Sequence, residues 1–424
     1  MKYIKTVAVY IIAFIAMLGF FVLDITLAAM IPQEKITESC ASAYCYLAKE
    51  SYYPSPFFDN GFGAAVYDNS TEAIIFNIIY NQDSEHPFKS GIRNWYTYTD
   101  SAEMINGLLE AYSGVEEGGP YTHYWVGIIL PVKILMIWFS YGEIRFIFYM
   151  LSMALFVYLV WKIWRCLGVR EAIAYIFTFF YMCIPNNIAN ITAAGDILLM
   201  LIFSLIFLGR YQKMKDNGFR YRFLMFLILG GLADFVDFLY APIMPLGMIV
   251  IMSILLDCKD RVSYKKQFGY FFWEIILYCT GYGLTAYTKG VLTQLIGEVE
   301  TGSTRFSYWI TGTFIYRLQA IIPPVTNLLN RATVFVPIVC LVIIIVLALA
   351  KRIEYRFSSI QLKNAAMIIF IGFFLPAVYF MILCNATIHR YYVQNLYPAI
   401  FAIAYLLLSF IDVKTTETRI KIEH

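Results

Sequence analysis

Apolar runs close to the length of a membrane-spanning helix recur along this chain, and they limit the folds that it can adopt. A bilayer core of about 30 Å requires about 20 apolar residues in one helix. The chain of 424 residues is 60% hydrophobic and only 14% charged, with a mean hydropathy of +0.65. We therefore expect an all-α polytopic membrane protein.

The order of apolar and basic segments predicts about ten or eleven transmembrane helices, with both chain ends in the cytoplasm. Lys and Arg collect in loops that stay on the cytoplasmic side, and here they cluster at both ends of the chain and in four internal loops. The expected spans are 7–23, 145–162, 172–185, 195–209, 223–236, 239–256, 268–287, 333–350, 365–383 and 394–411.

Residues 1–424 are expected to form a single membrane domain. The first apolar run, 7–23, is too long for the apolar part of a secretory signal peptide, and no clear small-residue cleavage site follows it. We interpret it as an anchored first helix. Residues 31–122 then form a long loop inserted between the first two transmembrane helices.

The inserted loop is the largest departure from the apolar composition. Between Glu34 and Glu117 it carries thirteen acids against four bases, a net charge near −9. The predicted topology puts this loop outside the cytoplasm. Segments 73–82 and 124–141 are expected to lie partly along the outer membrane interface.

The same topology collects polar side chains from distant segments at the outer face, where a site could form between lipid and water. These residues are Asp24, Asp68, Asn69, Glu72, His123, Tyr124, Asp234, Asp237, Lys289, Asn385, His389 and Arg390. The predicted spans, by contrast, are mostly free of interior charge. This pattern favours chemistry at a surface over passage through a pore.

Simpler structural roles stay open for several of these residues. Asn69 followed three positions later by Glu72 resembles a capping box at the start of an amphipathic helix. His389 also fits a basic anchor in an interfacial aromatic belt. Asp234 and Asp237 share a helical face and could bind a cation or share a proton, or they could form a solvated turn.

Motif spacing argues against several classes of protein. The chain has neither HExxH nor paired CxxC motifs, which argues against a zinc site. It also lacks GxxxxGK[ST], which disfavours an ATP-driven pump. A net charge of +3, spread over short patches, argues against nucleic-acid binding. Acid pairs leave a Mg²⁺ or Mn²⁺ site open, shared with a substrate phosphate.

Five short stretches carry a resemblance to a known family. They are DNSTE at 68–72, YTHYWVG at 121–127 leading to Lys133, DFLYAPIMPLG at 237–247, GYGLTAYTKG at 281–290 and NATIH at 385–389. In this order, behind a first helix and a long acidic outer loop, the chain resembles the GT-C superfamily of membrane glycosyltransferases. More specifically, it resembles a family of bacterial membrane proteins associated with cell-surface glycan assembly. GT-C enzymes use polyprenyl-phosphate-linked sugars.

The resemblance implies the transfer of a sugar from a lipid-phosphate donor to an extracytoplasmic cell-envelope glycan. The usual base of the superfamily is an Asp in the first outer loop, so Asp68 is the expected base, with Asp24 as the second choice. Glu72 would orient Asp68 or the acceptor. The cations expected at the phosphate are Lys133, Lys289, His389 and Arg390. The other expected substrate-binding residues are Asp24, Asn69, His123, Tyr124, Asp237 and Asn385.

Other functions stay open at this point. A transporter or flippase for a lipid-linked saccharide, a polysaccharide polymerase or ligase, and a non-catalytic scaffold would all suit a polytopic chain. The expected partners are a polyprenyl-phosphate-linked sugar, a glycan or lipid-linked glycan acceptor and membrane lipids. The expected location is the cell membrane, with the active site on its extracytoplasmic side.

Overall fold

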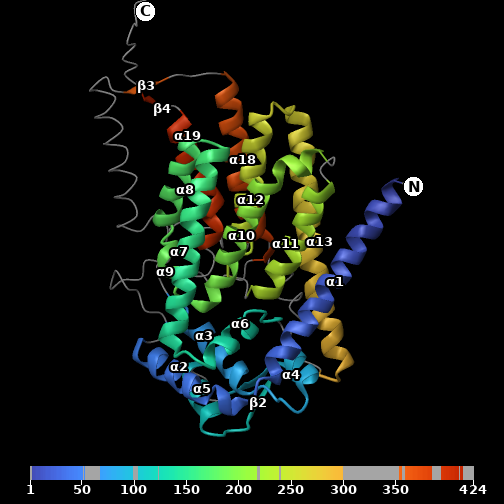
Figure 1. Ribbon diagram of the computed structural model, residues 1–424, viewed down its shortest axis with the longest axis vertical. Coiled ribbons are helices and arrows are strands. Elements are labelled where there is room, and N and C mark those ends of the chain that lie inside the picture. Colours follow the sequence, from blue (N-terminus) through green and yellow to red (C-terminus); the bar gives the residue numbers. More distant parts are fainter. Residues whose placement is uncertain are drawn as a thin grey trace, which may run out of the picture.

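The protein is mainly α-helical, with two short two-stranded sheets (Figure 1). The computed structural model describes residues 2–50, 52, 67–98, 104–122, 124–216, 220–237, 240–298, 353–355, 359–383, 393–409 and 411–413. The long helices form a bundle. They are α1 (Lys2–Met30), α7 (Tyr141–Cys166), α8 (Val169–Tyr181), α10 (Ile191–Asp216), α11 (Arg220–Val236), α12 (Ile243–Lys259), α13 (Tyr264–Leu295), α18 (Ser359–Leu383) and α19 (Tyr397–Ser409).

These helices overlap nine of the ten predicted spans, and the remaining span, 333–350, lies outside the described residues. Within the described ranges, three segments are long and apolar enough to cross a membrane by length and composition: Ile4–Met30, Tyr141–Cys166 and Ile191–Asp216. Helices α8 and α19 contain 13 residues each. They are shorter than the roughly 20 residues that a bilayer core requires.

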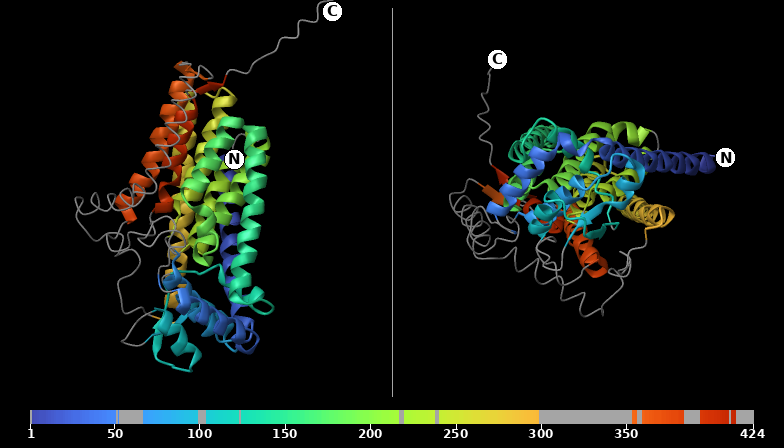
Figure 2. Two further views of the ribbon diagram at one scale, coloured as in Figure 1. Left: turned by 90° about the vertical axis from the view of Figure 1, so that its left-hand side faces the viewer. Right: turned by 90° about the horizontal axis from the view of Figure 1, so that it is seen from below.

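The residues between α1 and α7 form a separate layer under one end of the bundle (Figures 1 and 2). We call this layer the inserted segment. Its elements are η1 (Gln33–Lys35), α2 (Thr37–Glu50), α3 (Asn69–Tyr80), α4 (Pro87–Arg93), β1 (Trp95–Thr97), α5 (Met104–Tyr112), β2 (Gly118–Pro120) and α6 (Ile129–Met136). The view from below shows this segment crossing the bundle end (Figure 2).

Helix α3 is the centre of the inserted segment, because almost all of its side chains are buried. Asn77 ties it to the small sheet by accepting from the Thr97 N–H and donating to the Thr97 carbonyl, both at 2.9 Å. Strand β1 pairs antiparallel with β2, with Tyr96 opposite Gly119. A side chain at Gly118 would lie 2.3 Å from the Tyr96 carbonyl oxygen, so this strand pair requires a glycine there.

The bundle core depends on a close approach of α11 and α13. A Cβ atom added at Gly230 would lie 2.0 Å from the Tyr278 carbonyl oxygen, and one added at Gly281 would lie 2.0 Å from that of Leu227. Small residues allow helix backbones to pack closely, as is common between membrane helices. The two glycines therefore fix the helix pair that reaches the inserted segment.

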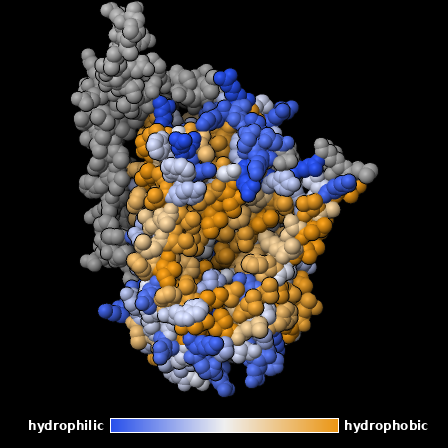
Figure 3. All heavy atoms as spheres, in the orientation of Figure 1, coloured by the Kyte–Doolittle hydropathy of each residue, from blue (hydrophilic) through white to orange (hydrophobic). Residues whose placement is uncertain are grey.

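Large apolar side chains cover the middle of the molecule, between two polar ends (Figure 3). On α1 alone, Ile4, Ile12 and Ile15 are each more than 60% exposed. Apolar side chains directed outwards at this density need a non-aqueous surrounding, because their transfer from water is favourable.

A buried ion cluster joins four helices at the end of the bundle opposite the inserted segment. We call it the Arg222 cluster. The Arg222 guanidinium contacts Asp257 at 3.0 Å and 3.1 Å and Glu274 at 2.5 Å, and it also donates to Ser253. The Tyr211 hydroxyl donates to Asp257 at 2.6 Å. Glu274 lies inside the predicted span 268–287, whereas Arg222 and Asp257 lie one residue outside the predicted spans 223–236 and 239–256.

The C-terminal part of the described chain contains a 3₁₀ helix, the last bundle helix and the second small sheet. The 3₁₀ helix η2 (Val393–Leu396) leads directly into α19, and β3 (Ile353–Tyr355) pairs antiparallel with β4 (Ile411–Val413). A short helix, α9 (Ile184–Asn187), links α8 to α10 near the inserted segment (Figure 1). The inserted segment, α10, the turn between α11 and α12, and η2 thus approach one end of the bundle.

Candidate functional site

Asp68 begins helix α3 and is buried, with 3% of its surface exposed. Its carboxylate accepts from the Thr71 N–H at 3.1 Å and from the Thr71 hydroxyl at 2.5 Å. Asp68 is therefore the N-cap, because its side chain satisfies a backbone donor that the first helical turn leaves open. The predicted capping box, with Asn69 as N-cap and Glu72 three residues later, is therefore wrong, because the N-cap is Asp68.

Glu72 is directed into the protein rather than back to the helix start, and it is fully buried. One carboxylate oxygen accepts from the Tyr141 hydroxyl and from Arg145 at 2.9 Å. The other accepts from the Ile191 N–H at the start of α10. Glu72 thereby joins the inserted segment to α7 and α10, at a helix N-terminus that favours negative charge.

Besides Glu72, Arg145 contacts two further polar side chains. It donates to Glu50 at 2.8 Å and to the Asn69 side-chain oxygen at 2.8 Å, and Asn69 donates to Glu50 at 3.1 Å. Burial raises the pKa of Glu72, while the Arg145 charge and the hydrogen bonds from Tyr141 and Ile191 act in the opposite direction. The carboxylate is accommodated because every one of these donors is fixed by a helix.

Tyr240 lies in the turn between α11 and α12, and its buried phenol is within electrostatic reach of Asp68, Asp196 and Glu72. We call Asp68, Glu72, Asp196 and Asp237 the carboxylate cluster. Burial, and then the charges of Asp68, Asp196 and Glu72, raise the pKa of Tyr240. Asp237 accepts from the Tyr240 N–H at 2.5 Å. Residues from the inserted segment and from two bundle regions thus meet here.

Asp196 and Asp237 lie side chain to side chain within the carboxylate cluster. Asp196 also accepts from the Ala241 N–H at 3.0 Å. A hydrogen bond between two carboxyl groups requires a proton on one of them, because two carboxylates offer only acceptors. The pair therefore brings two acceptor groups together beside the backbone donors of Tyr240 and Ala241.

The C-terminal part of the chain also fixes the turn that carries Tyr240. Asn395 in η2 is fully buried. It donates to the Tyr240 carbonyl at 3.2 Å and accepts from the Ile243 N–H at 2.9 Å.

An apolar groove of about 290 Å³ lies between α12, α13 and α18. Its walls include Leu246, Ile275 and Phe374. Tyr278 lines this groove, lies within electrostatic reach of Asp196 and Asp237, and donates to the Pro242 carbonyl at 2.5 Å. Tyr278 is therefore the described residue that links the groove to Asp196 and Asp237.

Two predicted cations make their contacts elsewhere. Lys133, on α6, is fully buried and donates to Gln82 at 3.0 Å. Lys289, on α13, donates to the Ile92 carbonyl at 2.7 Å and lies 5.4 Å from the centroid of the Trp125 ring. Both ammonium groups therefore bind inserted-segment atoms.

Asp24 and Tyr124 also lie in other surroundings. Asp24 is buried on α1, and one of its carboxylate oxygens makes no hydrogen bond in the described part of the chain. The Tyr124 backbone carbonyl accepts from Asn94 at 2.9 Å, and its ring lies beside that of Tyr121. The remaining predicted residues, His123, Asn385, His389 and Arg390, lie outside the described residues.

Sequence reasoning missed three residues of this site: Arg145, Asp196 and Tyr240. Asp196 carried a usable signal, since it is an acid inside a predicted span, where charge is costly. Arg145 is the first basic residue after a capping box formed by Ser140 and Glu143, and it resembles an interfacial anchor. Tyr240 carries no such signal among the 34 tyrosines of the chain.

The described side chains do not form a ready-made metal centre. Within the described ranges, no group of three or more His, Cys, Asp or Glu residues is arranged to hold a metal ion. The Asp196 and Asp237 pair supplies two such ligands. Mg²⁺ is usually held by one or two carboxylates together with substrate phosphate, so this donor set fits a shared ion.

Comparisons with protein families, with curated proteins and with solved structures find no match to this chain.

Proposed function

We propose that this protein is a polytopic membrane glycosyltransferase of the GT-C type. It would transfer a sugar from a polyprenyl-phosphate-linked donor to a cell-envelope glycan on the extracytoplasmic side. One observation carries the proposal: an inserted acidic segment contributes the buried Asp68 to a carboxylate cluster at one bundle end, and Tyr278 in an apolar groove lies within electrostatic reach of two members of that cluster.

The membrane part of the proposal is supported by the distribution of apolar surface. Exposed apolar side chains cover the middle of the face shown in Figure 3, between polar ends. Basic residues gather at the bundle end opposite the inserted segment, for example Lys215 and Arg220 at the turn from α10 to α11. The positive-inside rule assigns that end to the cytoplasm. The inserted segment would then lie outside.

In the proposed reaction, Asp68 acts as the general base. An acceptor hydroxyl oxygen bonds to the anomeric carbon of the donor sugar, the bond from that carbon to the phosphate oxygen breaks, and polyprenyl phosphate leaves. Asp68 takes the hydroxyl proton. Thr71 holds the carboxylate in place through its N–H and hydroxyl. Glu72 acts as a positioning residue, because its partners are Tyr141, Arg145 and the Ile191 N–H.

The carboxylate cluster suits the sugar more than the phosphate. Glycosyl transfer passes through a state with positive charge on the sugar ring, which nearby carboxylates stabilise. A leaving phosphate needs cations instead. We assign that role to His389 and Arg390, as the family resemblance implies. The hydrocarbon tail would occupy the groove beside Leu246 and Phe374.

The proposal is tested by replacing Asp68 with Asn in the full chain, reconstituted with a radiolabelled polyprenyl-phosphate sugar. Loss of a positioned base costs about 10²–10⁴ in rate. The matched control is Asp83→Asn, which changes an exposed acid on the same segment and should leave the transfer rate unchanged. An unchanged transfer rate in the Asp68→Asn variant would contradict the assignment of Asp68 as the base.

A second candidate, a transporter or flippase for a lipid-linked saccharide, is favoured by the Arg222 cluster. Ionisable residues buried between membrane helices often belong to transport pathways. The two candidates differ in a liposome experiment that follows a fluorescent lipid-linked sugar across the bilayer. Translocation without a new glycosidic bond would favour the transporter. A glycosidic bond without translocation would favour the transferase.

A further inference from the structure

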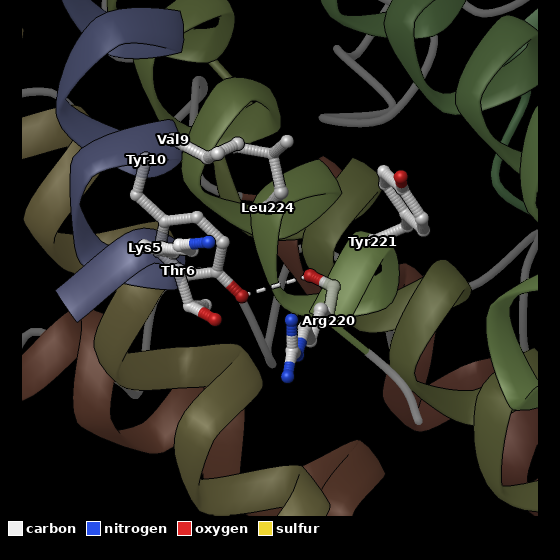
Figure 4. A pocket seen from close by; sticks show the side chains of 7 residues that line it. All are labelled: Lys5, Thr6, Val9, Tyr10, Arg220, Tyr221 and Leu224. Carbon is white, nitrogen blue, oxygen red and sulfur yellow. Dashed lines mark hydrogen bonds between the residues drawn. The ribbon is translucent and has the colours of Figure 1, made fainter. Parts of the chain in front are cut away.

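A second pocket lies at the bundle end opposite the inserted segment, between α1 and α11. It has a volume of about 180 Å³ and is lined by Lys5, Thr6, Val9, Tyr10, Arg220, Tyr221 and Leu224 (Figure 4). Neither the reaction proposed above nor the Arg222 cluster involves this pocket. Its lining therefore requires an explanation of its own.

The pocket combines two cations with polar and apolar walls. Lys5 and Arg220 carry the positive charges, and none of the lining side chains is acidic. Figure 4 shows both charged ends beside the space between the two helices. The Tyr10 hydroxyl donates to the Arg220 backbone carbonyl at 2.8 Å, which fixes α1 to the start of α11 at this pocket. This arrangement suits a group with several anionic oxygens.

The surroundings of the pocket indicate that the anion has an apolar part. Val9, Tyr221 and much of α1 are exposed apolar surface directly beside the two cations. Helix α1 leaves the bundle towards its N-terminus (Figure 1). Only 11% of the residues in its apolar stretch are buried. A gap between two diverging helices at the edge of an apolar belt is open to lipid chains as well as to headgroups.

We propose that this pocket binds the phosphate of an anionic phospholipid in the cytoplasmic leaflet, with Lys5 and Arg220 as its two cations. The inference goes beyond the glycosyltransferase proposal and shares with it only the membrane-spanning bundle. Basic pockets between membrane helices on the cytoplasmic side are suited to such headgroups. Bound lipid would hold the N-terminal turns of α1 against α11.

The test measures binding of dioctanoyl phosphatidylglycerol to the full chain in a neutral detergent, by native mass spectrometry. The double variant Lys5→Gln/Arg220→Gln should bind roughly tenfold more weakly, as expected from the loss of charge-assisted contacts. The matched control is Lys265→Gln/Lys266→Gln, which removes two exposed charges at the same bundle end outside the pocket. It should bind like the wild type.

Two further arms identify the ligand. Dioctanoyl phosphatidylcholine, which has no net charge, should bind roughly tenfold more weakly than phosphatidylglycerol. Glycerol phosphate tests whether a free phosphate suffices, and it should not compete at equal concentration. Equal loss of binding in both double variants would overturn the site, and full competition by glycerol phosphate would overturn the lipid. Binding is measured without any sugar donor, so a failed transferase proposal leaves this result unaffected.

Discussion

The two ends of the bundle both bury charge, but they compensate it differently. In the Arg222 cluster, one arginine contacts Asp257 and Glu274, and all three side chains are fully buried between the helices of the bundle. At the other end, Arg145 contacts Glu50 and Glu72, and Asp68 and Asp196 lie within electrostatic reach of Tyr240. The acid excess is therefore larger where the inserted segment meets the bundle.

The difference teaches that burial of charge alone does not identify a site. The Arg222 cluster is built entirely from neighbouring helices and adjoins no described groove, so we interpret it as a structural joint. The carboxylate cluster draws on residues far apart in the sequence, and two of its members, Asp196 and Asp237, lie within electrostatic reach of Tyr278 in the α12, α13 and α18 groove. Excess negative charge beside an opening can stabilise a positively charged reaction intermediate.

Replacing Arg222 should cause the largest loss of stability. Arg222→Gln would leave Asp257 and Glu274 buried without their cation, which typically costs about 3–5 kcal/mol. Thermal unfolding of the detergent-solubilised protein measures the loss, with the exposed Arg210→Gln as a matched control. Transfer activity per folded molecule should stay unchanged. A selective loss of activity at unchanged stability would contradict a structural role.

Replacing Arg145 should cost less stability but affect activity as well. Arg145→Gln removes the shared partner of Glu50 and Glu72, and because Glu50 is partly exposed we expect a loss of about 2–3 kcal/mol. Hydrogen exchange should rise in α2 and α3. The rate of sugar transfer should fall, because Asp68 is the N-cap of α3 and moves with that helix. The control is the exposed Arg165→Gln on the same helix. Unchanged exchange in α3 would contradict the connection.

The smallest effect concerns the pH dependence of stability at Lys133. Burial lowers the pKa of Lys133 to about 8, below the value of about 10.4 in an unfolded chain. Between these pH values the unfolded state binds one proton more than the folded state, so stability rises from pH 8 to pH 10. Lys133→Met should flatten that rise, whereas the exposed Lys35→Met should not. Melting temperatures across this window provide the measurement.

Sequence patterns predicted the positions of the helices better than the contacts between them. Apolar runs identified the positions of α1, α7 and α10, because a helix of this length must place its apolar side chains away from water. They did not reveal that Arg222 and Glu274 meet inside the bundle. Which charges become buried depends on helices that are distant in the sequence, and periodicity contains no such information.

The candidate site was predicted in part for the same reason. Asp68 and Glu72 stood out as acids before an apolar run, and Asp237 as an acid at an expected turn. Their proximity to Asp196 and Tyr240 follows from the packing of α3 against α10 and from the Asn395 contacts. The cap at Asp68 was assigned one residue too late, because both Asp and Asn are good N-caps.

The central claim is that a lipid-phosphate sugar lies in the groove with its sugar at the carboxylate cluster. It is tested most directly by a cryo-electron microscopy map of the chain in a nanodisc with a non-reactive polyprenyl-phosphonate sugar. We predict tail density between α12, α13 and α18, and sugar density within hydrogen-bonding distance of Asp68. Density for the lipid on another face of the bundle, with Asp68 out of contact with the sugar, would contradict the account.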